Sequence, residues 1–275
     1  MKVPIQDMLF AHVGQRGVGG PDCVPSYFEW QFVPTSTPAR FYDDLCMRDA
    51  PNHPRPRVGW LVEVPPYAQC HYDWAVEHEA EFDCILTPCL DYAMRGKPWR
   101  WYPRGGSMLL MSEWGVPRHK LRHVSFLASG KMNATGHKLR HEIYKRFGHR
   151  LECYGGVVGC AAANKVEAIA PYRFTVVVDA ERNAGCFCDH ILDAFALRTI
   201  PIYWGCPDIG RWFDAFGIWQ FDTLDELEDI LNLLTTGHYD SRATVIEGNL
   251  EAAWQYRVPE DWLWTNYPDL FEGLE

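Results

Sequence analysis

The stretch FTVVV at residues 174–178 is apolar and β-branched almost throughout, which is typical of a strand buried on both faces of a parallel sheet. Residues 188–197 have helical character, and the stretch IPIYW at residues 200–204 predicts the next strand. Two parallel strands need a long crossover connection, which a helix normally supplies. The order strand, helix, strand therefore predicts an α/β fold built on parallel sheets.

The same alternation extends in both directions from this unit. A strand is predicted at residues 124–128, a helix from about residue 136 and a leucine-rich helix around residues 224–234. Further strands are predicted in the first half of the chain, at residues 8–13, 58–64 and 82–87. The stretch 97–106 is dense in Pro, Trp, Arg and Gly, so we expect no regular structure there.

The length of 275 residues suits one large domain or two small ones. The simplest arrangement is two α/β domains, residues 1–115 and residues 116–275. Ligands of open parallel sheets bind at the carboxyl ends of the strands. We therefore expect a central cleft between the domains, lined by the loops that follow the strands.

Composition excludes several classes of function. The net charge is −10 and no long run of Lys and Arg occurs, so we expect no nucleic-acid partner. No segment approaches the ~18 apolar residues that span a bilayer, and the first residues lack the apolar region of a signal peptide. Twelve Trp and thirteen Tyr are many for this length, and these side chains suit clefts that bind sugars.

The ten cysteines carry no clear metal signature. Without a signal peptide we interpret most of them as reduced and buried. Residues 186–190, which read CFCDH, look like one half of a metal cluster. Because no second half of the CxxC type accompanies them, we expect no metal and no cofactor.

Residues 172–179, 188–195 and 199–207 read YRFTVVVD, CDHILDAF and TIPIYWGCP. These segments resemble the signature of glycosyltransferase family 10, the α-1,3-fucosyltransferases, whose pattern is Y-K-F-x-x-x-F-E-N-S, then Y-x-T-E-K-x-x-D-A, then P-I-Y-W-G-x-P. Upstream, its F-x-x-S-N, R-x-x-x-Y and D-S-G-G motifs are similar to residues 125–129, 140–144 and 153–156. The resemblance covers residues 121–235 well and residues 57–105 thinly.

The resemblance implies a GT-B-like fold, with two Rossmann-like domains facing the cleft. It implies inverting transfer of a sugar, L-fucose from GDP-fucose, to a hydroxyl of an oligosaccharide or glycoconjugate, without a bound metal. Eukaryotic members carry a membrane anchor. Its absence from this sequence leads us to expect a cytoplasmic protein of bacterial or viral origin or a truncated form, with peripheral membrane association left open.

The residue that the resemblance implies as catalytic base is Glu63, at the end of a predicted strand. The alternative is a solvated carboxylate, and a nearby acidic stretch competes for the role, with Glu77, Glu79 and Glu81. The glycine-rich stretch 14–20 lacks the ending of a phosphate-binding loop, so we interpret it as a flexible loop on the acceptor side.

Arg140 is the implied clamp for the diphosphate, because it lies near the start of a helix that follows a strand. The alternative is a surface arginine on an amphipathic helix. Asp189 and His190 occupy the family's Glu-Lys positions, where Glu holds the ribose and Lys meets the diphosphate. The remaining donor-binding residues that the resemblance implies are Ser129, Gly156, Asp179 and Tyr203.

Departures from the family pattern fall on the donor contacts. Asp189 keeps the charge of Glu with a shorter reach, and His190 is a cation only if bound phosphates raise its pKa. Cys186 stands in place of an aromatic residue, and Asp179-Ala180 replaces Glu-Asn. Three hypotheses follow: an inverting glycosyltransferase, a degenerate protein that binds a nucleotide or glycan without turnover, and a metal-dependent hydrolase with zinc at Cys186, Cys188 and His190.

Overall fold

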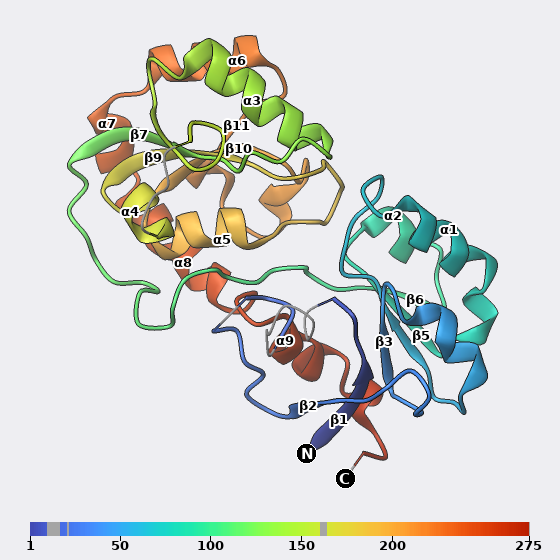
Figure 1. Ribbon diagram of the computed structural model, residues 1–275. Coiled ribbons are helices and arrows are strands. Elements are labelled where there is room, and N and C mark those ends of the chain that lie inside the picture. Colours follow the sequence, from blue (N-terminus) through green and yellow to red (C-terminus); the bar gives the residue numbers. More distant parts are fainter. Residues whose placement is uncertain (10–16, 21, 160–163, 275) are drawn as a thin grey trace. The chain divides into compact units, whose positions relative to one another are not determined.

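The computed structural model describes residues 1–9, 17–20, 22–159 and 164–274 (Figure 1). The chain divides into two compact units. Unit 1 comprises residues 1–106, 183–186 and 256–275, and unit 2 comprises residues 107–182 and 187–255. The chain therefore first passes from unit 1 to unit 2 between residues 106 and 107. The sequence analysis had placed the domain boundary between residues 115 and 116.

Unit 1 is built on a six-stranded sheet in the order β2-β1-β3-β4-β5-β6. All of its pairs between described strands are parallel. The strands are β1 Lys2–Gln6, β2 Glu29–Phe32, β3 Phe41–Asp43, β4 Val58–Trp60, β5 Cys84–Thr87 and β6 Trp99–Trp101. The α-helices are α1 Gln69–Glu77, α2 Leu90–Ala93 and α9 Pro259–Asn266, and short 3-10 turns are formed by Met47–Asn52, Glu79–Glu81 and Pro268–Phe271.

The C-terminal segment packs on unit 1, which corrects its assignment to a domain of residues 116–275. Leu263, Leu270 and Phe271 are buried in one cluster with Val3 and Phe41 of the first strands. Tryptophan side chains fill much of this core, and Trp60 is fully buried among other aromatic rings. Burial of the apolar face of α9 therefore explains why the chain returns to the first sheet.

Unit 2 is built on a five-stranded parallel sheet in the order β11-β10-β9-β7-β8. The strands are β7 Arg122–Leu127, β8 Glu152–Tyr154, β9 Tyr172–Val178, β10 Ile200–Trp204 and β11 Trp219–Gln220. The α-helices are α3 Thr135–Phe147, α4 Lys165–Ile169, α5 Asp189–Ala196, α6 Leu224–Leu233, α7 Thr236–Asp240 and α8 Ala243–Trp254. Two 3-10 turns, Ile209–Arg211 and Ala215–Gly217, follow β10.

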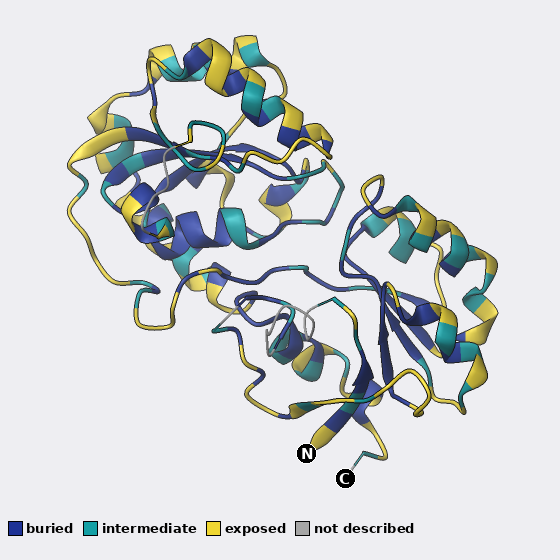
Figure 2. Cartoon of the chain, in the orientation of Figure 1, coloured by how far each residue is buried: buried dark blue, intermediate teal, exposed yellow. Residues whose placement is uncertain are grey.

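The second sheet is covered on both faces, with α3 and α6 on one side and α4 and α5 on the other (Figure 1). Alternate residues of β9, Phe174 and Val176, pack with Ile143 of α3 and Leu227 of α6. Figure 2 shows the result as dark, buried strands between helices whose outer faces are exposed. This double cover is the reason why β9 and β10 are apolar on both faces.

The predicted α/β class with parallel sheets is confirmed, and the errors lie mainly in unit 1. The first strand is Lys2–Gln6 and not 8–13, of which residues 10–13 lie outside the described part of the chain. The sequence analysis missed β2 and β3. Residues 97–106, expected to lack regular structure, contain the edge strand β6, and the strand predicted at 58–64 ends already at Trp60.

Among the helices in the described part of the chain, none combines the length and the apolarity needed to cross a bilayer.

Candidate active site

Two of the predicted donor-binding residues meet at the carboxyl edge of the second sheet. Asp179 directly follows β9, and Tyr203 lies near the end of the neighbouring β10. The Tyr203 hydroxyl donates to Oδ2 of Asp179 at 2.5 Å and accepts the backbone N–H of Cys206 at 2.9 Å. Both side chains are buried. Burial raises the pKa of the Asp179 carboxyl, while the hydrogen bonds from Tyr203 and Cys188 act in the opposite direction.

Cys188 and His190 complete a compact group that we call the Asp179–Cys188–His190 cluster. The Cys188 thiol lies 3.1 Å from Oδ1 of Asp179 and 3.1 Å from Nδ1 of His190. Nδ1 of His190 is 3.8 Å from Oδ1 of Asp179. Cys188 is buried, whereas the His190 side chain is 36% exposed. Among the described residues, the cluster meets solvent through the His190 side chain.

Arg140 and Ser129 lie near the same edge of the sheet, where β9 ends at Val178. Arg140, in the second turn of α3, is buried, and its guanidinium donates twice to the carbonyl of Val178, with Nε at 3.0 Å. A third contact, of 3.4 Å, reaches Oγ of Ser129. The alternative of a surface arginine is therefore wrong. Burial lowers the pKa of Arg140, and the Coulomb attraction of Asp179 opposes this shift.

The start of α3 is occupied by the loop that follows β9. The backbone N–H of Thr135 donates to the Glu181 carboxylate at 3.0 Å, and that of Gly136 donates to the carbonyl of Ala180 at 2.8 Å. A Cβ at Gly136 would lie 1.8 Å from the carbonyl oxygen of Asp179. Two of the helix N–H groups that could face a phosphate thus already have protein partners.

Gly156, which is predicted to bind the donor, and Gly205 pack closely against other residues of unit 2. A Cβ at Gly156 would lie 2.7 Å from the backbone nitrogen of Gly130, and one at Gly205 would lie 2.3 Å from the Tyr203 hydroxyl. In the glycine-rich stretch 14–20, Gly17 and Gly19 are buried and tightly packed, which contradicts the interpretation of this stretch as a flexible loop. Residues 14–16 lie outside the described part of the chain. Close packing is therefore the observed role of these glycines.

Asp189 is held by residues that the sequence analysis did not select. Its Oδ2 lies 2.5 Å from Nζ of Lys165, and the same ammonium lies 2.7 Å from Oδ2 of Asp193. Oδ1 of Asp193 accepts the Ser107 hydroxyl at 2.6 Å. The two carboxylates raise the pKa of Lys165 above its ordinary value, despite burial. Asp193 matches the Asp of the D-A in the family pattern, so the sequence could have identified it as a site residue. Nothing in the sequence singled out Lys165.

Glu63 lies in the loop after β4, in unit 1, and its side chain is 30% exposed. The Arg104 guanidinium lies 3.6 Å from its carboxylate, and Nε of Arg104 donates to the carbonyl of Val62 at 3.1 Å. The backbone of Glu63 is fixed by Asp44, which accepts its N–H at 3.2 Å, and by the Tyr72 hydroxyl, which donates to its carbonyl at 2.9 Å. A carboxylate on a well-fixed backbone with a partly exposed side chain is consistent with the role of a base.

Two of the three competing acidic residues pair with neighbouring side chains. Glu79 accepts hydrogen bonds from Arg95 at 3.0 Å and from the Trp99 indole at 2.8 Å. These two bonds lower the pKa of Glu79. Glu81 pairs with Arg57 at 3.2 Å, and Glu77 is exposed at the end of α1. The interpretation of this stretch as a solvated surface fits these positions.

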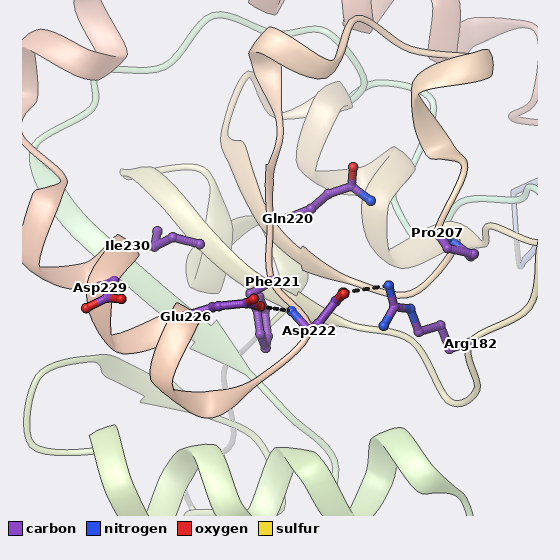
Figure 3. Close-up of a pocket in the computed structure, with 8 residues that line it drawn as sticks. All are labelled: Arg182, Pro207, Gln220, Phe221, Asp222, Glu226, Asp229 and Ile230. Atoms are coloured by element: carbon purple, nitrogen blue, oxygen red, sulfur yellow. Dashed lines mark hydrogen bonds and ion pairs between the residues drawn. The ribbon is translucent and has the colours of Figure 1, made fainter.

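A pocket of about 470 Å³ opens at the carboxyl edge of the second sheet (Figure 3). Arg182 comes from the loop after β9, Pro207 from the loop after β10 and Gln220 from β11, while the loop before α6 and α6 itself supply the rest of the wall. Arg182 pairs with Asp222 across the pocket at 2.5 Å. The lining residues are Arg182, Pro207, Gln220, Phe221, Asp222, Glu226, Asp229 and Ile230. Its volume lies within the range of small-molecule sites, and its place is where open parallel sheets bind ligands.

Comparison with known proteins shows what this chain is similar to in sequence and in fold. No protein-family model matches the sequence. The α-(1,3)-fucosyltransferase FucT of Helicobacter pylori is 30% identical over 121 residues, which are 41% of this chain and 24% of that protein. The match thus covers about a quarter of the length of the relative.

Solved structures extend the likeness to almost the whole chain. An α1,3-fucosyltransferase with GDP superposes with a TM-score of 0.60 at 14% identity, covering 94% of this chain and 92% of that one. The structure with GDP-fucose gives a TM-score of 0.57 at 14% identity and covers 100% and 91%. The chain resembles the α-1,3-fucosyltransferases in sequence and in fold.

The GtfA/B complex is a further structural neighbour, with a TM-score of 0.54 at 11% identity over 86% of this chain and 58% of that one. The predicted resemblance to fucosyltransferases and the GT-B-like α/β fold are confirmed. The assignments of Glu63, Ser129, Arg140, Gly156, Asp179, Asp189, His190 and Tyr203 to catalysis or donor binding stay predictions.

Proposed function

We propose that this chain is an inverting glycosyltransferase that moves L-fucose from GDP-fucose to a hydroxyl group of a glycan. The observation that carries the proposal is the agreement of sequence and fold: 30% identity to a fucosyltransferase over 121 residues, and a fold shared with a fucosyltransferase over 94% of the chain. The described residues offer a candidate for each group that such transfer needs.

Inverting transfer requires a base, a binding site for the nucleotide and stabilisation of the leaving diphosphate. Glu63 is the proposed base, because its side chain is partly exposed on a fixed backbone. It would take the proton of the acceptor hydroxyl as that oxygen attacks the anomeric carbon. The bond from this carbon to the diphosphate breaks in the same step, and the configuration inverts.

The nucleotide is proposed to bind at the carboxyl edge of the second sheet. The pocket beside Arg182 and Asp229 has room for a base and ribose, and a carboxylate is a suitable acceptor for the N–H groups of guanine. His190, 36% exposed at the start of α5, would meet the diphosphate, where the bound anion and the helix dipole act on its protonation in opposite directions.

The experiment is an assay of the purified chain with GDP-fucose and a panel of oligosaccharide acceptors, in the absence of added metal. Release of GDP together with a fucosylated product would support the proposal, and nuclear magnetic resonance of the product would give the anomer. An inverting enzyme converts the β-linked donor into an α-linked product. A β-linked product would count against the proposal. So would a failure to release GDP with any acceptor of the panel.

Two observations favour a second candidate, a protein of the same fold that binds a nucleotide or glycan without turnover. The Asp189 carboxylate is held by Lys165 at 2.5 Å, and Arg140 donates to the carbonyl of Val178. Groups with such internal partners bind a ligand only after rearrangement. Saturable binding of GDP-fucose without transfer or hydrolysis over many hours would select this second function.

A further inference from the structure

Three side chains at the end of β9 and the start of α5 offer the donor atoms that zinc prefers. These are a carboxylate oxygen of Asp179, the sulfur of Cys188 and Nδ1 of His190, and they lie within 4.8 Å of one another. Thiolate, imidazole and carboxylate are the three zinc ligands that proteins use. The set differs from the one considered in the sequence, because Asp179 takes the place given there to Cys186.

The distances between the three atoms suit a single ion. Tetrahedral zinc, with the usual bond lengths to sulfur, nitrogen and oxygen, separates its ligand atoms by roughly 3.4–3.6 Å. In the cluster, sulfur lies 3.1 Å from the oxygen and 3.1 Å from the nitrogen, and the oxygen lies 3.8 Å from the nitrogen. Shifts of a few tenths of an ångström would therefore bring the three atoms onto one ion.

The surroundings support the ligands. The second oxygen of Asp179 accepts the Tyr203 hydroxyl at 2.5 Å, and such an outer hydrogen bond orients a ligating carboxylate. Asp179 and Cys188 are buried, so their backbone positions are fixed by the core. His190 closes the cluster toward solvent with a side chain that is 36% exposed. Three protein ligands and one solvent-facing side describe a site whose fourth position is open.

We propose that Asp179, Cys188 and His190 bind a zinc-type divalent cation, with a fourth position open to water or to an anionic oxygen. The carboxylate and the thiolate together balance the two charges of the ion. The site shares His190 with the donor site proposed above, but the metal-binding test below does not depend on sugar transfer.

The test uses Co²⁺ as a spectroscopic substitute for zinc, added to the chelator-treated full chain. Cobalt bound by a thiolate in tetrahedral geometry gives a near-ultraviolet charge-transfer band and intense visible bands. We expect both at one equivalent of Co²⁺, and their loss when Zn²⁺ is added. Zn²⁺ affinity then follows from competition with a chromophoric chelator. Absence of the charge-transfer band, or a band that needs a large excess of Co²⁺, would overturn the proposal.

Substitutions of single residues test which side chains bind the metal ion. Cys188→Ser should abolish the charge-transfer band, and Cys188→Ser and His190→Ala should each lower Zn²⁺ affinity more than about 100-fold, since even outer partners are worth 10–100-fold. Tyr203→Phe should cost about 10–100-fold with the charge-transfer band retained. Cys70→Ser, which changes an exposed thiol, is the matched control and should bind normally. Circular dichroism of the metal-free variants establishes that they are folded. Unchanged binding by Cys188→Ser would overturn the proposal.

Discussion

The hydroxyl of Tyr203 lies 2.5 Å from Oδ2 of Asp179, and a Cβ at Gly205 would lie within 2.5 Å of that same oxygen. The hydroxyl also accepts the N–H of Cys206, so its proton and a lone pair are both used. This one side chain therefore ties the loop after β10 to the first residue after β9, at the edge where the candidate donor residues gather.

Tyr203→Phe should lower the free energy of unfolding of unit 2 by about 1–3 kcal/mol, because it leaves the buried Asp179 carboxyl and the Cys206 N–H each short of a partner. Gly205→Ala should also destabilise, since its Cβ would lie 2.3 Å from the hydroxyl. Denaturant unfolding of both variants and of the pair measures the coupling. We expect the pair to cost less than the sum, as the phenylalanine removes the nearest of the clashing atoms. Strict additivity would show that the contact is not formed.

Lys165→Met should destabilise unit 2 by about 3–5 kcal/mol, because it leaves the fully buried Asp193 carboxylate and its neighbour Asp189 without their shared cation. Lys138→Met, on the exposed side of α3, is the matched control and should change stability by less than about 0.5 kcal/mol. Chemical denaturation followed by tryptophan fluorescence gives both values. Equal effects of the two substitutions would mean that Lys165 is not part of a buried ion pair.

Glu260 predicts a pH dependence of stability. Burial raises the pKa of its carboxyl to about 7, although Oε1 accepts the N–H of Val18 at 2.7 Å. The folded chain thus holds this proton more tightly than the unfolded chain does. The contribution of Glu260 to stability is fully present below the unfolded pKa and is lost as the pH rises to about 7. Above that pH the loss is complete.

Relative to Glu260→Gln, the unmodified chain should therefore lose about 3 kcal/mol of unfolding free energy between pH 4.5 and pH 8. Denaturant midpoints across this range measure the difference. Glu29→Gln, an exposed substitution in the same unit, should leave the pH profile as it is. A Glu260→Gln profile parallel to that of the unmodified chain would contradict the buried, protonated carboxyl.

The strength of sequence inference differs between the two sheets. The strands β9 and β10 could be predicted because both faces are buried, so their apolar runs leave little choice. The edge strand β6 could not, because its three residues include Arg100 and directly follow Pro98. The short strand β1 could not be predicted either, because its central residue is Pro4, and proline argues against a strand.

Part of the candidate site also could not be predicted from the sequence. Motif similarity pointed to Asp179 and His190, which the structure brings within 3.8 Å of each other. Lys165 lies 28 residues from Asp193, and its burial between two carboxylates depends on how α4 packs against α5. No local pattern carries that information, since a lysine at a helix start is usually solvated.

Glu63→Gln tests the proposed base. We expect kcat to fall about 10²–10⁴-fold while the affinity for GDP stays the same, because the amide cannot take a proton but fills the same space. Steady-state transfer rates and equilibrium titration with GDP separate the two effects. Glu77→Gln, at an exposed position of the same unit, is the control and should keep full activity. A parallel loss of GDP affinity in Glu63→Gln would argue against the role of a base.

The measurement that tests the central claim most directly is calorimetric titration of the purified chain with GDP, UDP, CDP and ADP, without added metal. The account predicts saturable binding of GDP at one site and no comparable binding of the other three nucleotides. Preferential binding of another nucleotide would contradict the GDP-fucose donor, and binding of none of the four would contradict a nucleotide-sugar transferase altogether.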